Sequence, residues 1–240
     1  MHPKQDIHPN GTHAMTRTRL VHATLAAALC AACAMPAFAQ QDIDKINGGI
    51  NAEAGQQYGD LSTVNGGIQL AEGARAEDVQ TVNGGITGGN GVHAQSLSTV
   101  NGGIRLGEQA RIADDIETVN GGIFVDRGGQ VGGDIASVSG GIGLVDSDVA
   151  GSIQTVSGDI TVGIGSHIRG GVRIEKPDKG FNIRFGKRKV PRVVIGPDAV
   201  VDGPLVFERE VVLYVHDSAR TGAITGATAI RFSTPTPPDE

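Results

Sequence analysis

Aromatic residues are scarce in this chain: tryptophan is absent, and all aromatic residues together make up 3% of its 240 residues. Aromatic rings bury large apolar areas and usually contribute heavily to the core of a globular domain. Without them, the interior has to be filled by Ile, Val, Leu and Ala. Glycine, in contrast, is abundant, with 37 residues.

Cysteine and net positive charge are also lacking. The two cysteines, Cys30 and Cys33, lie within the first 39 residues, so the rest of the chain has no disulfide, thiol nucleophile or cysteine metal ligand. Acidic residues outnumber basic residues by 26 to 20, which gives a net charge of −6. Because nucleic acid binding needs a basic face, nucleic acid is not an expected partner.

The N-terminus has the pattern of a secretory signal peptide. Arg17 and Arg19 precede a short apolar stretch at 20–34, and the small residues at 37–39 are typical of a signal peptidase site. The stretch is too short to span a membrane, so we expect an exported chain that starts at Gln40 and has no transmembrane segment. The alternative, a buried alanine-rich helix, does not explain why the repeats begin directly after this site.

A short phrase, TVNGGI at 81–86, recurs along the chain with its copies 18 or 19 residues apart. A fixed short period is typical of a solenoid. Within each unit the apolar residues alternate, as Ile68 and Leu70 do, and the β-branched residues and glycines favour strands over helices. The sequence therefore predicts an all-β fold, a single-stranded parallel β-helix of about nine or ten coils. The copies are INGGI at 46–50, VNGGI at 64–68, 82–86, 100–104 and 119–123, VSGGI at 138–142 and VSGDI at 156–160.

Each coil is expected to contain three short strands and three bends. In the unit 61–78, Asn65-Gly66-Gly67 makes one bend because Asn and Gly tolerate positive φ, and Glu72-Gly73 makes the next. Stacking turns every position into a column. One predicted inner column is Ile50, Ile68, Ile86, Ile104, Ile123, Ile142 and Ile160, and a second is Ile46, Val64, Val82, Val100, Val119, Val138 and Val156. A column of hydrogen-bonded amides is predicted at the corner, with Asn47, Asn65, Asn83, Asn101 and Asn120.

The repeat breaks after Gly170 and resumes at Val193. We therefore expect a leader at 1–39 whose true start is Met15, and a β-helix at 40–228 with an insertion at 175–192. The polar, proline-rich segment 229–240 is predicted to be a flexible tail.

The stacked coils and V-x-G-x-I phrases resemble bactofilins, which are polymer-forming bacterial β-helix proteins. They are also similar to an exported adhesin-type family of repeat β-helices, whose units read much like TVSGDI at 155–160. The resemblance covers 43–170 and, more weakly, 193–228. It implies a right-handed β-helix and, from bactofilins, end-to-end polymerisation. Bactofilins act in the cytoplasm whereas this chain has a leader, so the resemblance bears on the fold more than on the cellular role.

The insertion is the one strongly basic segment. Its cations and two interleaved phenylalanines suggest a projecting hairpin that binds an anionic envelope glycan, a lipid headgroup or an acidic protein. A solvated loop that protects a strand edge is the alternative. The candidate binding residues are Phe181, Arg184, Phe185, Lys187, Arg188, Lys189 and Arg192.

Three other polar columns have structural explanations. His93 and His167 occupy equivalent places in coils four apart, which is too far to share a metal. The aspartates before each new coil suit a turn that accepts backbone N–H groups, although a cation between them is an alternative; they are Asp60, Asp78, Asp115 and Asp134. A column of Thr63, Thr81, Thr99, Thr118, Ser137 and Thr155 suits a strand or, alternatively, a flat outer face that orders water.

No catalytic cluster, metal site or cofactor site is expected, because narrow solid coils leave no cavity for a substrate. The leading interpretation is an exported, non-catalytic structural or adhesive protein of the periplasm or cell surface that associates with itself. A binding module that uses the basic insertion is the alternative, and a polysaccharide-active enzyme is the least favoured.

Overall fold

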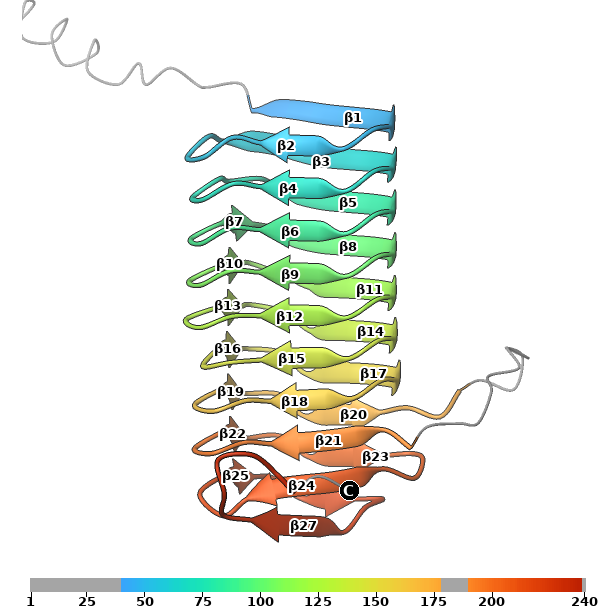
Figure 1. The fold of residues 1–240 in the computed structure, drawn as a ribbon, viewed down its shortest axis with the longest axis vertical. Helices are drawn as coiled ribbons and strands as arrows, with labels where there is room; N and C mark the ends of the chain where they lie inside the picture. The colour runs from blue at the N-terminus through green and yellow to red at the C-terminus, as the bar shows by residue number, and fades with distance from the viewer. Residues whose placement is uncertain (1–39, 178–189, 239–240) are drawn as a thin grey trace, which may run out of the picture. The chain divides into compact units, whose positions relative to one another are not determined.

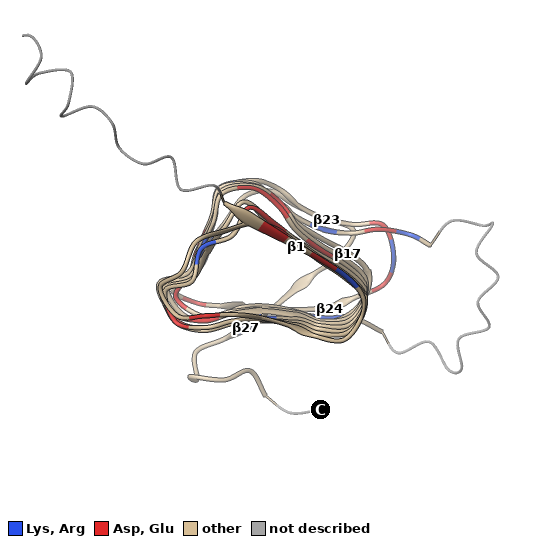
Figure 2. Cartoon of the chain, turned by 90° about the horizontal axis from the view of Figure 1, so that it is seen from above, with Lys and Arg blue, Asp and Glu red and all other residues tan. Residues whose placement is uncertain are grey.

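The computed structural model describes residues 40–177 and 190–238, and within them it contains 27 strands and no helix. The strands form a β-solenoid of about ten turns, in which each turn contributes one strand to each of up to three walls (Figures 1 and 2). All strand pairs between successive turns are parallel. The predicted fold class is confirmed.

Two of the walls are ten-stranded sheets and the third has seven strands. In order along the axis, sheet A consists of β1 (Gln41–Asn47), β3 (Tyr58–Asn65), β5 (Asp78–Asn83), β8 (Ser96–Asn101), β11 (Ile116–Asn120), β14 (Ile135–Ser139), β17 (Ile153–Ser157), β20 (Val172–Ile174), β23 (Leu205–Phe207) and β26 (Ile224–Thr225). Sheet B consists of β2 (Ile50–Ala52), β4 (Ile68–Leu70), β6 (Ile86–Gly88), β9 (Ile104–Leu106), β12 (Ile123–Val125), β15 (Ile142–Leu144), β18 (Ile160–Val162), β21 (Arg192–Ile195), β24 (Val212–His216) and β27 (Ala229–Phe232). Sheet C consists of β7 (His93–Ala94), β10 (Arg111–Ile112), β13 (Gln130–Val131), β16 (Asp148–Val149), β19 (His167–Ile168), β22 (Val200–Val201) and β25 (Arg220–Thr221).

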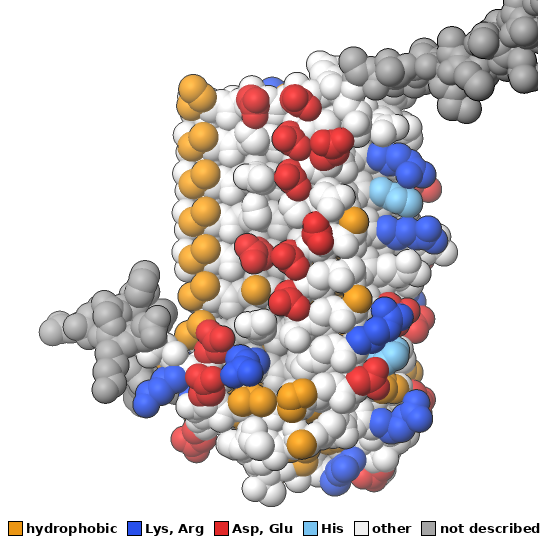
Figure 3. All heavy atoms as spheres, turned by 180° about the vertical axis from the view of Figure 1, so that it is seen from behind, with side chains coloured by type: hydrophobic (Ala, Val, Ile, Leu, Met, Phe, Trp, Pro, Cys, Tyr) orange, Lys and Arg blue, Asp and Glu red, His pale blue; other side chains and the backbone are white. Residues whose placement is uncertain are grey.

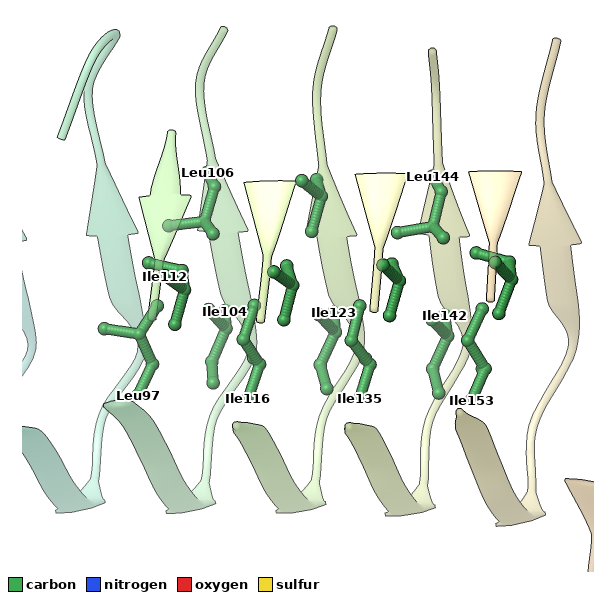
Figure 4. Close-up of a cluster of buried hydrophobic side chains, with 14 of the residues drawn as sticks. Leu97, Ile104, Leu106, Ile112, Ile116, Ile123, Ile135, Ile142, Leu144 and Ile153 are labelled. Carbon is green, nitrogen blue, oxygen red and sulfur yellow. The ribbon is translucent and has the colours of Figure 1, made fainter. Parts of the chain in front are cut away.

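The core is a set of aliphatic columns inside these walls, in which like residues stack on one another (Figure 4). In sheet B, Ile68 pairs with Ile86, and Ile86 pairs with Ile104. The predicted column from Ile50 to Ile160 is confirmed, because its members are at most 2% exposed. Sheet A contributes a second inner column of Leu61, Val79, Leu97, Ile116, Ile135, Ile153, Val172 and Leu205, all fully buried.

The second predicted inner column, Ile46, Val64, Val82, Val100, Val119, Val138 and Val156, is wrong. Val64, Val82, Val100, Val119 and Val138 are 39–48% exposed, and Ile46 is 73% exposed. The reason is strand alternation: β3 continues through Val64, so Leu61 and Thr63 point inward and Val64 points outward. The same alternation buries the threonine column, whose members from Thr63 to Thr155 are 2–4% exposed, so that column makes no outer face.

The hydroxyls of the buried threonines donate hydrogen bonds to a glycine carbonyl at the corner of the preceding coil. The hydroxyl of Thr118 donates to the carbonyl oxygen of Gly102 at 2.9 Å, and Ser137 donates to Gly121 at 3.1 Å. The equivalent bonds are Thr63 to Gly48, Thr81 to Gly66 and Thr99 to Gly84, at 2.8–3.0 Å. A carbonyl that is partly shielded from water needs a partner, which the hydroxyl of Thr or Ser provides in these five coils. The Thr155 hydroxyl has no partner among the described residues, and nothing in the structure explains this.

The two glycines of each corner have different roles. A Cβ on Gly121 would overlap with the backbone carbonyl of Gly102, whereas a Cβ on Gly122 would lie 3.1 Å from the oxygen of Gly141. The first glycine is therefore required by close coil-to-coil approach, and the last repeat accordingly keeps Gly158 but has Asp159 in the second place. Positive φ is not the reason, contrary to expectation, since Gly48 (φ 98°) is the only described corner glycine with positive φ.

Positive φ occurs instead at the bend between sheets B and C. Gly73 (φ 67°) and Gly91 (φ 63°) adopt it there, and Gln109 (φ 58°) adopts it in the next coil, so the bend predicted at Glu72-Gly73 is confirmed. At the C-terminal end, β27 pairs with β24, so the solenoid extends four residues past the predicted boundary at 228.

Replacing Thr118 by Val should lower the free energy of unfolding by about 1–2 kcal/mol, because the shape is kept while the Gly102 carbonyl loses its donor. Urea unfolding followed by far-UV circular dichroism measures the change. Thr118→Ser is the matched control, since Ser137 makes the same bond naturally. If the Val variant is as stable as the Ser variant, the hydroxyl bond does not stabilise the corner.

Replacing Gly121 by Ala should cost about 2–3 kcal/mol, because the new methyl group meets a backbone carbonyl that cannot move without separating two coils. Gly122→Ala, one residue away, should cost less than about 1 kcal/mol. The melting temperatures of the two variants test this ranking directly. Equal melting temperatures would contradict the close-approach explanation.

Candidate functional site

The outward valines form a continuous apolar column on sheet A, here called the valine ridge. It comprises the exposed side chains of Ile46, Val64, Val82, Val100, Val119 and Val138 and the half-buried Val156, one residue in each of seven successive coils. The register fixes their alignment, because Thr63 pairs with Thr81 and Asn65 pairs with Asn83 on either side of the valines. Figure 3 shows the ridge as a straight vertical file of hydrophobic side chains.

A shallow groove of about 510 Å³ runs beside the valine ridge. One wall is the ridge itself, and the floor is the backbone of the threonine column. The opposite wall is formed by the outward residues two places earlier in each strand, namely Ser62, Gln80, Ser98, Glu117, Ala136 and Gln154. The groove ends at Glu175, which follows the last aligned position of β20. The molecule thus presents an apolar ridge next to a groove that follows six of the ridge's seven coils.

A continuous column of exposed apolar side chains is unusual on a protein surface. Single exposed valines are common, but contiguous apolar patches usually mark a contact with another molecule. The stacked side chains cannot shield one another further, since each already lies directly above the next at the strand spacing of about 4.8 Å. The valine ridge is therefore the strongest candidate for an interaction site on sheet A.

The predicted basic site lies mostly outside the described residues. Phe181, Arg184, Phe185, Lys187, Arg188 and Lys189 all fall in 178–189, so the expected binding there stays a prediction. Arg192 is described, and its side chain is engaged within the chain. Its guanidinium lies 4.8 Å from the centre of the Tyr214 ring and donates to the carbonyl oxygen of Pro238 at 3.1 Å. Arg192 therefore contributes to the packing of the C-terminal segment on sheet B.

The corner asparagines form the expected ladder of side-chain amides. Asn65, Asn83, Asn101 and Asn120 each donate to the amide oxygen of the preceding asparagine, at 2.9–3.1 Å, beginning with Asn47. Because each amide is used by its neighbours along the axis, the ladder has a structural role at the A–B corner.

The aspartates at the start of sheet A strands accept hydrogen bonds from backbone N–H groups of the next coil. The Asp60 carboxylate accepts from the N–H of Asp78 at 3.2 Å, and Asp115 accepts from Asp134 at 2.7 Å. His167 lies between two carboxylates, 3.7 Å from Asp148 and 2.7 Å from Asp202. In the described ranges, no group of three or more His, Cys, Asp or Glu side chains is arranged to hold a metal ion.

Sequence reasoning missed the valine ridge because it counted every apolar β-branched residue of the repeat as core. The signal that could have found it is the alternation from Leu61 to Thr63, or from Val79 to Thr81, which leaves Val64 and Val82 on the outer face. Thr and Val have nearly the same shape and strand preference, so the inner and outer columns differ only by one hydroxyl.

The described part of the chain has no helix that is long and apolar enough to span a membrane. Comparisons with protein-family models, with curated proteins and with solved structures found no match for this chain. The functional argument therefore depends on the geometry of the solenoid and its surface columns.

Proposed function

We propose that this chain is an exported, non-catalytic structural rod of the cell envelope, and that copies of it associate side by side through the valine ridge. The leader pattern at 15–39 supports the export, and the seven-coil apolar column supports the association. The ridge is the single observation that carries the proposal, because a contiguous column of outward apolar side chains usually marks a contact with another molecule.

A second copy is the partner that matches the ridge best. Its own ridge has the same repeat along the axis, so apolar side chains meet apolar side chains at every coil. The groove beside the ridge follows six of its seven coils, so in an antiparallel two-fold arrangement the two ridges contact each other and each also lies along the groove of the other copy. Such an isologous contact closes on itself and limits the assembly through this face to pairs.

The expected contact is small. Seven coils at about 4.8 Å spacing give a strip roughly 30 Å long and one side chain wide. The surface area buried by such a strip is at the low end for specific protein interfaces. Association should therefore be reversible and concentration-dependent. The acidic residues nearby, such as Glu117, lie in the opposite wall of the groove and not on the ridge, so the apolar strip itself is free of like-charge repulsion.

Replacing Val82, Val100 and Val119 together by Thr should weaken association at least tenfold, since three central apolar contacts become polar while strand preference and shape are kept. Sedimentation velocity over a concentration series measures the association. The matched control is Ile164→Thr with Ile230→Thr, which removes exposed apolar groups (55% and 47% exposed) away from the ridge. Association of the triple variant equal to that of wild type, or a strictly monomeric wild type, would contradict the proposal.

Cysteine cross-linking tests the antiparallel arrangement. Val100 is the fourth of the seven ridge residues, so in a two-fold pair it faces itself, whereas Ile46 faces the other end. In a Cys30→Ser, Cys33→Ser background, Val100→Cys should form a disulfide dimer on mild oxidation, and Ile46→Cys should not. Efficient cross-linking of both variants would indicate a parallel pair, and cross-linking of neither would remove the ridge as the interface.

A further inference from the structure

Sheet C has a strip of cations along its outer surface, separate from the valine ridge. Arg75, His93 and Arg111 occupy the same position in three successive coils, and the register pairs His93 with both arginines. The positions on either side are Gln57 and Gln130. Figure 3 shows these cationic and histidine side chains stacked near one edge of the view. We call Arg75, His93 and Arg111 the arginine strip.

Neither Arg75 nor Arg111 has a salt-bridge partner among the described residues. The salt bridges found in the described residues are Arg127 with Glu108, His167 with Asp148 and Asp202, and Arg173 with Glu208. Neither Arg75 nor Arg111 belongs to this described set, although the whole chain has a net charge of −6. The two guanidinium groups are two coil spacings apart, which is about 10 Å, and in their column only the His93 imidazole lies between them.

The electrostatic consequence is visible at the imidazole. Burial lowers the pKa of His93, and the positive charges of Arg75 and Arg111 lower it further. These two arginines lie on the coils directly before and after His93, while Glu77 lies at the following corner and Asp148 lies three coils away. An anion bound along the strip would relieve the repulsion between the arginines and favour the protonated imidazole.

The strip lies in an open groove of about 610 Å³ that extends along the axis from Gln40 to Arg169. Its charged lining residues are Arg75, Arg111 and Arg169 with His93, against the single carboxylate of Asp148. Apart from the inward-facing Ile112 and Val131, the remaining lining side chains are small or carry amides, which donate to and accept from hydroxyl groups. They include Gln57, Ala76, Gln95, Ala113, Gln130 and Gly132.

We infer that this groove binds a linear polysaccharide that carries carboxylate groups. Guanidinium groups recognise carboxylates through paired hydrogen bonds, and their alignment along the axis fits a chain with repeated charges better than a single small anion. The amides between the arginines suit sugar hydroxyls, and the small residues leave room for the rings. None of the described lining residues is Phe, Tyr or Trp, so the groove lacks the large aromatic rings on which single-stranded nucleic acids usually stack successive bases.

Binding to polygalacturonate by the full-length chain, measured by isothermal titration calorimetry at low salt, tests the inference. The double variant Arg75→Gln, Arg111→Gln should bind about tenfold or more weakly, because two charge-assisted contacts are lost. The matched control Arg105→Gln, Arg127→Gln changes the net charge equally but alters arginines outside the groove, since Arg105 lies over Phe124 on sheet B. The control should bind within about twofold of wild type, and the dependence on salt should be shallower in the strip variant.

The pH dependence gives a second readout. Since the free His93 has a lowered pKa, it is neutral at pH 8, and an anion in the groove raises its affinity for a proton. Polygalacturonate should therefore bind more tightly as the pH falls from 8 towards 5.5, and His93→Gln should reduce this gain. A pH response unchanged in His93→Gln would overturn the assignment of His93 to the groove.

Three results would overturn the inference as a whole. They are equal weakening in the strip and control variants, binding of neutral pullulan or free inorganic phosphate as tight as that of polygalacturonate, and equally tight binding of single-stranded DNA. The ridge variant Val82→Thr, Val100→Thr, Val119→Thr should bind polygalacturonate like wild type, because sheet C is unchanged. The inference on sheet C and the proposed association on sheet A therefore fail or hold separately.

Discussion

Parallel stacking of one coil on the next at a single strand spacing is the constraint from which the rest of the structure follows. At the A–B corner the N–H of Gly102 donates to the carbonyl oxygen of Asn120 at 3.0 Å, while the carbonyl oxygen of Gly102 accepts from Thr118. The backbones approach so closely there that a Cβ on the first glycine has no space. Each corner residue thus makes a specific hydrogen bond to the neighbouring coil. The Asn-Gly-Gly sequence must recur because a corner of different shape would break the register with the coils on both sides.

The same constraint turns the surface into columns. An outward residue in one coil lies directly above its equivalent in the next, so a single favoured side chain produces a line rather than a point. The valine ridge shows the uniform case, with β-branched apolar residues over seven coils. The strip on sheet C shows the local case, in which arginine, histidine and glutamine follow one another. Binding sites on such a rod are therefore expected at surface columns that are unusually apolar or charged, and not in a cavity enclosed by the core.

The repeat allowed the period, the parallel sheets, the isoleucine column and the bend at Gly73 to be predicted, because each follows from spacing and side-chain size. It did not allow the inner and outer faces of T-V-N-G-G to be distinguished. Apolar character favoured burying Val64, but the alternation of β3 turns Thr63 inward, where its hydroxyl donates to the carbonyl oxygen of Gly48 in the preceding coil. The C-terminal packing was also missed: Phe232 lies edge-on to Tyr214 at 6.5 Å, on the outer face of sheet B. Nothing local in the sequence indicates which outer face a terminal segment will cover.

The positions of the two surface columns within one coil bear on how the proposed activities would combine. The chain passes from sheet A through the Asn-Gly-Gly corner to sheet B, and only then to sheet C. The valine ridge is next to the A–B corner, so it lies at the end of sheet A that is remote from the arginine strip (Figure 3). Two rods joined ridge to ridge would keep both strips open to solvent on opposite sides of the pair. A carboxylated polymer could then contact each rod independently, and the pair would join two polymer chains, which a monomer cannot do.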